Sequence, residues 1–178
     1  MTAETNLPKR RLMLLRHAKS AWPDGVADHD RPLSERGLKA APRMGAYIAS
    51  EGLMPDLALV STSRRTQQTW RRIKRELPAS IEQRDLDDLY EAPAARLAAL
   101  LHAMDPSVRT LLLIGHNPGF HDLALGLVGS GDREIRTRLD EKFPTGALVV
   151  IDFEAHFWDD VRPRSGVLER FVVPRSLR

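Results

Sequence analysis

The stretch Leu12-Met13-Leu14-Leu15-Arg16-His17-Ala18 decides the fold, because four bulky apolar residues are followed at once by a cation and a histidine. Such an apolar run predicts a buried strand of a parallel sheet. In open α/β sheets, ligands bind just beyond the carboxyl ends of the strands. We therefore expect Arg16 and His17 to lie at the ligand-binding edge of the sheet.

A second stretch repeats this arrangement about a hundred residues later. The apolar run Thr110-Leu111-Leu112-Leu113-Ile114 is followed directly by Gly115-His116-Asn117-Pro118-Gly119. Parallel strands deliver the residues that follow them to the same edge of a sheet. The two stretches together predict that His17 and His116 meet at one site.

Length and composition are typical of a globular protein with one domain. The chain has 178 residues, of which 42% are hydrophobic and 29% charged, and a domain of this size buries about 70% of its unfolded surface. We expect a flexible N-terminal leader over residues 1–10 and a single domain over residues 11–178. The polar start has no apolar signal core, and no run approaches the roughly 18 apolar residues of a membrane span, so a cytoplasmic protein without a membrane partner is expected.

Charge and residue usage argue against two further classes of protein. The net charge is +3, yet the basic residues are dispersed and aromatic residues make up only 6% of the chain, which gives no stacking platform for nucleic acid. The mild positive bias favours anionic substrates instead. The chain has no cysteine, which excludes disulfides and thiolate ligands, and no His-x-x-x-His pattern appears, so we expect no metal and no cofactor.

The chain alternates between predicted strands and predicted helices. Strands are expected over residues 11–16, 57–60, 80–84, 110–114, 147–153 and 167–173. Helices are expected from a Ser34 cap to about Gly52, over 64–77, over 94–104 behind Pro93, from Pro118 to about Val128, and over 132–139. This order predicts a three-layer α/β/α sandwich with a mostly parallel sheet. The last two strands have a short connection, so at least one should be antiparallel at an edge.

Four motifs in this order resemble the histidine phosphatase superfamily, whose fold is phosphoglycerate mutase-like. They are Arg16-His17, Asp30-Arg31-Pro32-Leu33-Ser34-Glu35-Arg36-Gly37, Ser61-Thr62-Ser63-Arg64-Arg65-Thr66-Gln67-Gln68-Thr69 and Gly115-His116. The short chain and the Gly-His-Asn-Pro-Gly turn are most similar to the SixA-type phosphohistidine phosphatases. The resemblance covers about residues 11–174. Thr62 and Ala18 depart from it, since the family usually has proline and often glycine at these positions.

The residues at the two strand ends suit phosphoryl transfer, which requires positioning and stabilisation of charge on the phosphoryl oxygens. His17 offers a neutral nitrogen as the nucleophile, and Arg16 and Arg65 can each fork onto phosphoryl oxygens. In the resemblance, Arg65 rather than Arg64 takes the family's arginine position, and Arg64 lies about 100° around the helix from it. His116 adds donors to the same anion.

Two weaker candidates complete the expected substrate-binding set. Asn117 as N-cap and Pro118 as first helical residue would aim free backbone N–H groups at the anion. Ser20 could lend a hydroxyl to the pocket.

A proton donor for the leaving group is the least certain part of the pattern. Glu91 resembles the position of the family's general acid, a role worth about 10²–10⁴-fold in rate. Asp87 and Asp88 compete for this role, and a helix-entry residue is the structural alternative for Glu91. An imidazole leaving group, with a reference pKa of about 6.5, needs less proton assistance than an alkoxide.

The remaining histidines and tryptophans are expected to be structural. We interpret Trp22, Trp70 and Trp158 as packing residues. Arg31 is expected to order the loop by pairing with Asp28 or Asp30, with a position at the rim of the pocket as the alternative. Surface or loop positions are expected for the other four histidines, which are His29, His102, His121 and His156.

The function that the sequence favours is a metal-independent phosphatase with a covalent phosphohistidine intermediate on His17. The expected substrate is phosphohistidine on a protein, with small phosphomonoesters as the close alternative. A phosphoglycerate mutase is less favoured, because keeping the intermediate from water would need a lid. The alternative from another class is a non-catalytic scaffold that binds phosphate or phosphoproteins.

Overall fold

Strand β1 (Lys9–Arg16) is the central strand of the sheet in the computed structural model, which describes residues 8–177. The strand order is β3-β2-β4-β1-β6-β7-β5. All four apolar side chains of the 12–15 run are fully buried. They are buried because β1 has a neighbouring strand on each side and a helical layer on each face.

The parallel half of the sheet sets the position of both histidines. It contains β1, β2 (Leu57–Ser61), β3 (Glu82–Leu86) and β4 (Thr110–Gly115). In the register of β1 and β4, Arg16 lies opposite Gly115. The residue after each partner is a histidine, so His17 and His116 leave the sheet at the same edge.

The other half of the sheet corrects one prediction. Neither of the last two strands lies at an edge of the sheet. Strand β6 (Leu148–Glu154) is antiparallel to both β1 and β7 (Gly166–Val172). Its first four residues are fully buried, as suits an apolar run with a strand on either side. The edge position belongs to β5 (Val128–Gly131), which is parallel to β7.

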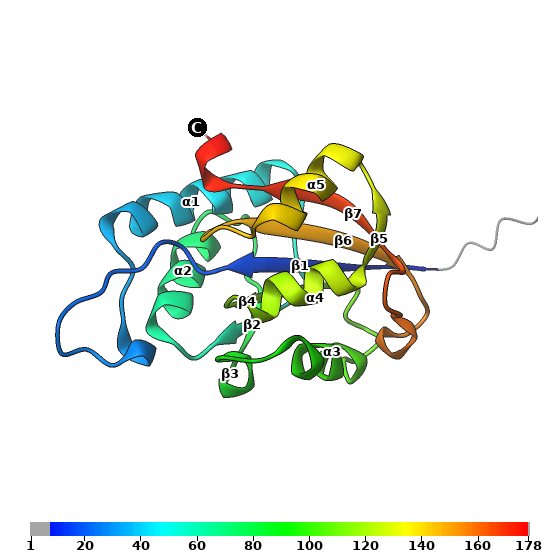
Figure 1. Cartoon of the computed structure of the whole chain (residues 1–178), viewed down its shortest axis with the longest axis horizontal. Coiled ribbons are helices and arrows are strands. Elements are labelled where there is room, and N and C mark those ends of the chain that lie inside the picture. The colour runs from blue at the N-terminus through cyan, green and yellow to red at the C-terminus, as the bar shows by residue number, and fades with distance from the viewer. Residues whose placement is uncertain (1–7, 178) are drawn as a thin grey trace, which may run out of the picture.

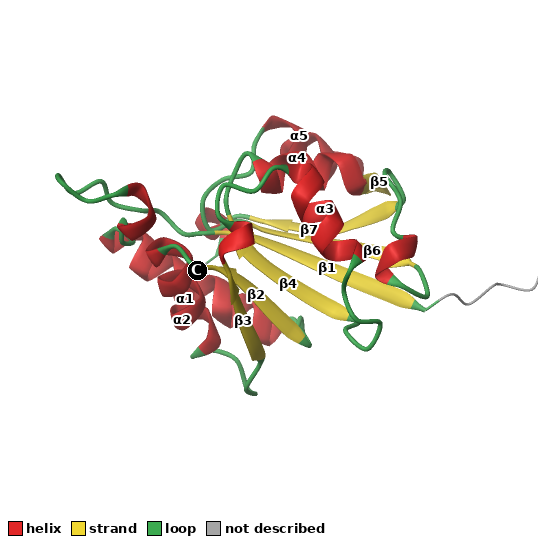
Figure 2. Cartoon of the chain, turned by 90° about the horizontal axis from the view of Figure 1, so that it is seen from below, coloured by secondary structure: helices red, strands yellow, loops and turns green. Residues whose placement is uncertain are grey.

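Within residues 8–177, five α-helices cover the two faces of the sheet, which confirms the three-layer α/β/α architecture (Figure 1). Helices α1 (Glu35–Ser50) and α2 (Arg64–Lys74) lie on one face. Helices α3 (Ala94–His102), α4 (Gly119–Leu127) and α5 (Arg133–Glu141) lie on the other, as Figure 2 shows from below. Successive side chains of β1 point to opposite faces of the sheet, so Met13 packs in the α1–α2 core and Leu14 in the opposite core.

The N-terminal boundary differs from the prediction. Residues 1–7 of the expected leader lie outside the described residues, but Lys9 and Arg10 belong to β1. Arg10 is buried, and its Nη1 donates to the carbonyls of Pro106 and Val108 at 2.8 and 2.9 Å. A basic residue thus continues the strand because backbone carbonyl oxygens accept hydrogen bonds from the end of its buried side chain.

Within residues 8–177, no helix has both the length and the apolar character that crossing a bilayer requires.

Candidate active site

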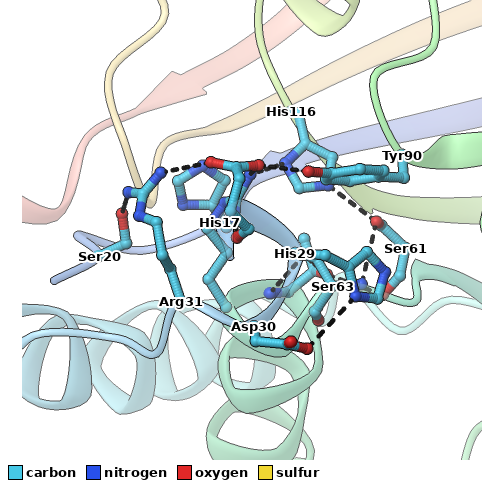
Figure 3. A network of polar contacts seen from close by, with 12 residues as sticks. His17, Ser20, His29, Asp30, Arg31, Ser61, Ser63, Tyr90 and His116 are labelled. Carbon is cyan, nitrogen blue, oxygen red and sulfur yellow. Dashed lines mark hydrogen bonds and ion pairs between the residues drawn. The ribbon is translucent and has the colours of Figure 1, made fainter. Parts of the chain in front are cut away.

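The two histidines face each other at the carboxyl ends of β1 and β4 (Figure 3). Their ring centroids are 5.4 Å apart and the rings are tilted by 51°. The backbone N–H of His17 donates to the Gly115 carbonyl at 3.1 Å, which extends the β1–β4 ladder by one residue. Each histidine is only 7% exposed, so the sheet holds both rings in place.

The two expected arginines reach the same place from different elements. Arg16 ends β1, and its Nη1 donates to the Phe143 carbonyl at 3.0 Å. Arg65 lies in the first turn of α2, which Ser63 caps by accepting from the Thr66 N–H. Arg65 is 6% exposed whereas Arg64 is exposed to solvent. The helix therefore turns one arginine of the pair into the site, as the 100° spacing predicts.

A cavity of about 220 Å³ joins these side chains. The structure brings six of the seven candidate site residues to its wall, and the lining contains no carboxylate. The cavity therefore suits an anion of phosphate size. Its lining residues are Arg16, His17, Lys19, Ser20, Trp22, Arg31, Arg65, His116, Asn117 and Thr145.

His17 is set up as a neutral ring with one free nitrogen. Its Nδ1 lies 2.8 Å from the Ala18 carbonyl, and because a carbonyl only accepts, Nδ1 carries the proton. The lone pair is then on Nε2. Burial lowers the pKa of His17 to about 4, and the positive charges of Arg65, Arg16 and Arg31 act in the same direction. At neutral pH the ring is therefore uncharged and nucleophilic.

His116 is neutral as well, in the opposite tautomer. Its Nδ1 lies 3.4 Å from Arg65 Nη2, which can only donate, so this nitrogen accepts. Its Nε2 then donates to Ser61 Oγ at 2.8 Å. Burial, His17 and Arg65 lower the pKa of His116 to about 3. A dianion in the cavity would oppose this shift and favour a donating imidazolium.

A carboxylate and a phenol, neither of them among the predicted site residues, contact the arginines of the site. Asp28, in the 3₁₀ turn Asp28–Asp30, accepts from Arg31 Nη1 at 2.7 Å and from Arg65 Nη2 at 3.1 Å. Tyr90 also donates to this carboxylate. The Tyr90 hydrogen bond, together with Arg31 and Arg65, holds the pKa of Asp28 well below its usual range. Asp28 is thus an anion that engages Arg65 beside the cavity.

The expected pairing of Arg31 with Asp28 or Asp30 was the one sequence signal for this cluster, and the structure gives Asp28 as the partner. Tyr90 had no such signal, because 62 positions separate it from Asp28. Its ring also packs edge-on against His116, with centroids 5.4 Å apart.

Asn117 lines the cavity but does not cap the helix. The predicted arrangement was wrong: Pro118 is the N-cap residue of α4, and the first helical residue is Gly119. The Asn117 Nδ2 group donates instead to the Phe143 carbonyl at 2.9 Å. This contact ties Asn117 to the carbonyl that Arg16 also uses.

Two further residues lie in unexpected surroundings. Glu91 is exposed, has a φ of 54°, and is absent from the cavity lining. Trp22 is not a packing residue like Trp70 and Trp158, since it is 75% exposed. The Arg31 guanidinium lies over its ring, 3.2 Å from the centroid. Trp22 therefore forms a rim of the cavity.

Residues 8–177 contain no group of three or more His, Cys, Asp or Glu side chains arranged to hold a metal ion.

Together, the fold and the site define a three-layer α/β protein with two neutral histidines and several cations around one anion-sized cavity. The model of the histidine phosphatase superfamily (branch 1) matches residues 12–106. The chain belongs to this superfamily, and phosphatase activity is the activity that membership supports.

Curated and structural relatives agree with this assignment. An uncharacterised protein of Mycobacterium tuberculosis is 37% identical over 163 residues, covering 90% of this chain and 100% of the relative. The crystal structure of a candidate phosphohistidine phosphatase SixA from Agrobacterium tumefaciens has a TM-score of 0.79 and 31% identity, covering 94% of this chain and 99% of that one. A second candidate SixA, from Nakamurella multipartitia, has a TM-score of 0.76, 28% identity and coverage of 93% and 96%. The predicted similarity to the SixA-type branch is confirmed.

Proposed function

We propose that this protein is a metal-independent phosphatase that hydrolyses phosphohistidine on proteins through a covalent intermediate on His17. The observation that carries the proposal is the state of His17: a buried, neutral ring with its proton on Nδ1 and its Nε2 free. A nucleophile needs this lone pair. Two relatives described as SixA phosphohistidine phosphatases support the substrate class.

The reaction takes two displacements at phosphorus. In the first, Nε2 of His17 forms a bond to phosphorus while the bond from phosphorus to the substrate's imidazole nitrogen breaks. The bonding electron pair stays on that nitrogen, and the substrate ring, protonated on its other nitrogen, leaves as neutral imidazole. In the second, water attacks the phosphorus of phosphorylated His17, which releases inorganic phosphate and restores the ring. No redox partner or co-reactant other than water is required.

The cations of the cavity stabilise the charge on the transferring group. Arg16 and Arg65 each present a guanidinium at the cavity wall, and a charge-assisted hydrogen bond contributes about 1.5–3 kcal/mol. Arg65 is held by Asp28 in this structure. A phosphoryl group that carries more negative charge than Asp28 would compete for the same Nη2 donor.

The nature of the leaving group explains why the reaction needs no carboxylic acid in the cavity to protonate it. Imidazole is a far weaker base than an alkoxide, so its departure needs little proton assistance. The cavity lining contains no carboxylate, and Glu91 lies outside it. This geometry favours phosphohistidine over alkyl phosphates.

A phosphate-binding scaffold without turnover is the second candidate function. The cavity itself would serve both roles, since the same cations bind and stabilise phosphate. The neutral His17 favours the enzyme, because a scaffold needs only cations.

The test compares three proteins on two substrates. Wild type, His17→Ala and a surface control, Arg64→Ala, are assayed with a phosphohistidine protein and with p-nitrophenyl phosphate. We expect turnover of both by wild type, with the larger kcat/KM for phosphohistidine, and none by His17→Ala. Phosphate binding without any turnover would instead establish the scaffold.

A second test is the effect of a metal chelator, which should leave the rate of hydrolysis unchanged. If the chelator abolishes hydrolysis and added zinc or magnesium restores it, the metal-free mechanism is refuted.

A further inference from the structure

A second cavity, of about 270 Å³, lies beside the catalytic one. Lys19 and Thr145 line both cavities. The remaining walls come from the start of α1, the end of α5, the segment 142–145, and the end of β7 with the turn that follows it. The proposed phosphatase mechanism uses none of the residues that line only this second cavity.

The second cavity has a strongly positive wall. Five exposed cations line it against a single carboxylate, Glu141, whereas the whole chain has 27 basic and 24 acidic residues. None of the five has an ion-pair partner among residues 8–177. This concentration of uncompensated charge favours an anionic ligand. The five cations are Lys19, Arg36, Arg138, Lys142 and Arg175.

The floor of the second cavity is apolar. Phe171 is buried, and Pro144, Val173 and Pro174 are half-buried around it. The Arg138 guanidinium lies 5.4 Å from the centroid of the Phe171 ring. A ligand that fits both parts carries negative groups together with an apolar portion, as a peptide segment does.

The backbone around Gly146 connects the second cavity to the reacting atoms. The Gly146 N–H lies 3.0 Å from the Arg16 carbonyl and 2.8 Å from the His17 carbonyl. Three residues earlier, the Phe143 carbonyl accepts from the Arg16 guanidinium. Pro144 and Thr145, between these two contacts, line the second cavity. A segment bound there therefore lies next to the group that receives the phosphoryl.

We propose that this second cavity binds an acidic segment of the protein substrate, next to the phosphorylated histidine. The inference rests on the proposed function and adds the substrate feature that the enzyme selects. Five cations around an apolar floor exceed what one further small anion needs, and the shared wall at Lys19 lets one chain span both cavities. Negative side chains flanking the phosphohistidine would be attracted to the cations, and apolar ones would cover Phe171.

The test reverses two charges of the second cavity that lie outside the catalytic lining. Arg36→Glu/Arg175→Glu is suitable because Arg36 is in the first turn of α1, where a carboxylate suits the helix dipole and the fold is retained. The matched control is Arg71→Glu/Lys74→Glu on the exposed side of α2, which changes the net charge equally. The substrates are a phosphohistidine peptide with flanking glutamates, the same peptide with glutamines, and p-nitrophenyl phosphate.

We expect wild type to prefer the glutamate peptide and the cavity variant to lose about tenfold in kcat/KM on it, mostly through KM. The glutamine peptide and p-nitrophenyl phosphate should be hydrolysed as before. The control should keep the wild-type preference. Equal losses on all three substrates, or no preference in wild type, would overturn the inference.

A binding measurement separates this inference from the proposed function. The unphosphorylated glutamate peptide should bind wild type and the control, and bind the cavity variant about tenfold more weakly. This result with no hydrolysis of phosphohistidine would leave the peptide site standing and refute the function. Hydrolysis of phosphohistidine with no peptide binding, or with binding only of inorganic phosphate at the second cavity, would refute the peptide site alone.

Discussion

Two adjacent arginines have opposite surroundings at the start of α2. Arg65 is buried at the cavity wall and within 3.4 Å of His116, whereas Arg64 is exposed. We expect Arg65→Ala to lower kcat/KM by about 10- to 100-fold, from the loss of charge-assisted bonds to the phosphoryl group. Arg64→Ala should stay within about twofold of wild type. Steady-state kinetics on both variants checks the pair, and similar losses for both would show that the helix register does not select Arg65.

Glu91 is the candidate general acid, and the rate gain from a general acid depends on how basic the leaving group is. Glu91→Gln, which removes this candidate general acid, should slow alkyl phosphate hydrolysis by up to about 10²–10⁴-fold, and the loss should grow with leaving-group basicity. Phosphohistidine hydrolysis should change by about twofold or less, because imidazole leaves with little assistance. Rates on a series of leaving groups measure this difference. Equal losses across the series would remove the acid role.

Sequence alone could predict the residues whose position follows from one strand end or one helix turn. Arg16 ends β1 and His17 follows it directly. The spacing along α2 shows that only one of Arg64 and Arg65 can face the site, and the family resemblance selects Arg65. Asp28 and Tyr90 could not be predicted in this way, since only the folded chain brings them together across 62 positions. The capping prediction for Asn117 failed for a related reason: the Phe143 carbonyl, a distant acceptor, takes its side chain.

Among the elements, the start of α1 packs directly against the backbone of Lys19, a residue that lines both cavities. The Lys19 carbonyl accepts from the Ser34 N–H at 2.9 Å, and a Cβ on Gly37 would come within 2.1 Å of it. We expect Gly37→Ala to destabilise the fold by about 1–3 kcal/mol through overpacking. It should also raise KM, because Lys19 lines both cavities.

The control for this element is Gly126→Ala in α4, where an added Cβ would meet nothing within 4 Å. It should leave KM unchanged and keep or raise stability, by up to about 1 kcal/mol. Denaturant unfolding and KM values measure both effects. A Gly37→Ala variant as stable as wild type would show that α1 does not press against the Lys19 backbone.

Most elements could be predicted because their apolar pattern and their caps agree. Ser34 caps α1 as predicted, by accepting a backbone N–H. Asp132, predicted as the first residue of the last helix, instead caps α5 in the same way. Strand β5 was missed because two of its four residues are glycines, which disfavour strands. The prediction that one of the last two strands lies at an edge was wrong because β5 pairs with β7 and takes that edge.

For the whole molecule, the two buried histidines predict a loss of stability in acid. Burial lowers the pKa of His17 to about 4 and that of His116 to about 3. In the unfolded chain both return to about 6.5, so the unfolded state binds protons first as the pH falls. The free energy of unfolding should therefore fall by about 1.4 kcal/mol per pH unit for each histidine between pH 6 and pH 4.

Denaturant unfolding of phosphate-free protein at a series of pH values measures this slope. A His17→Asn/His116→Gln variant should lose most of it, because neither replacement titrates. A slope in the variant equal to that of wild type would show that other groups cause the acid lability.

The central claim is that Nε2 of His17 is the nucleophile that attacks phosphorus. The direct measurement is rapid mixing with a phosphohistidine substrate, a denaturing alkaline quench and peptide mass spectrometry. We predict a phosphoryl group on His17, which forms before phosphate is released and is absent in His17→Ala. A phosphoryl group on His116 instead, or full turnover with no phosphorylated enzyme at any time, would contradict the account.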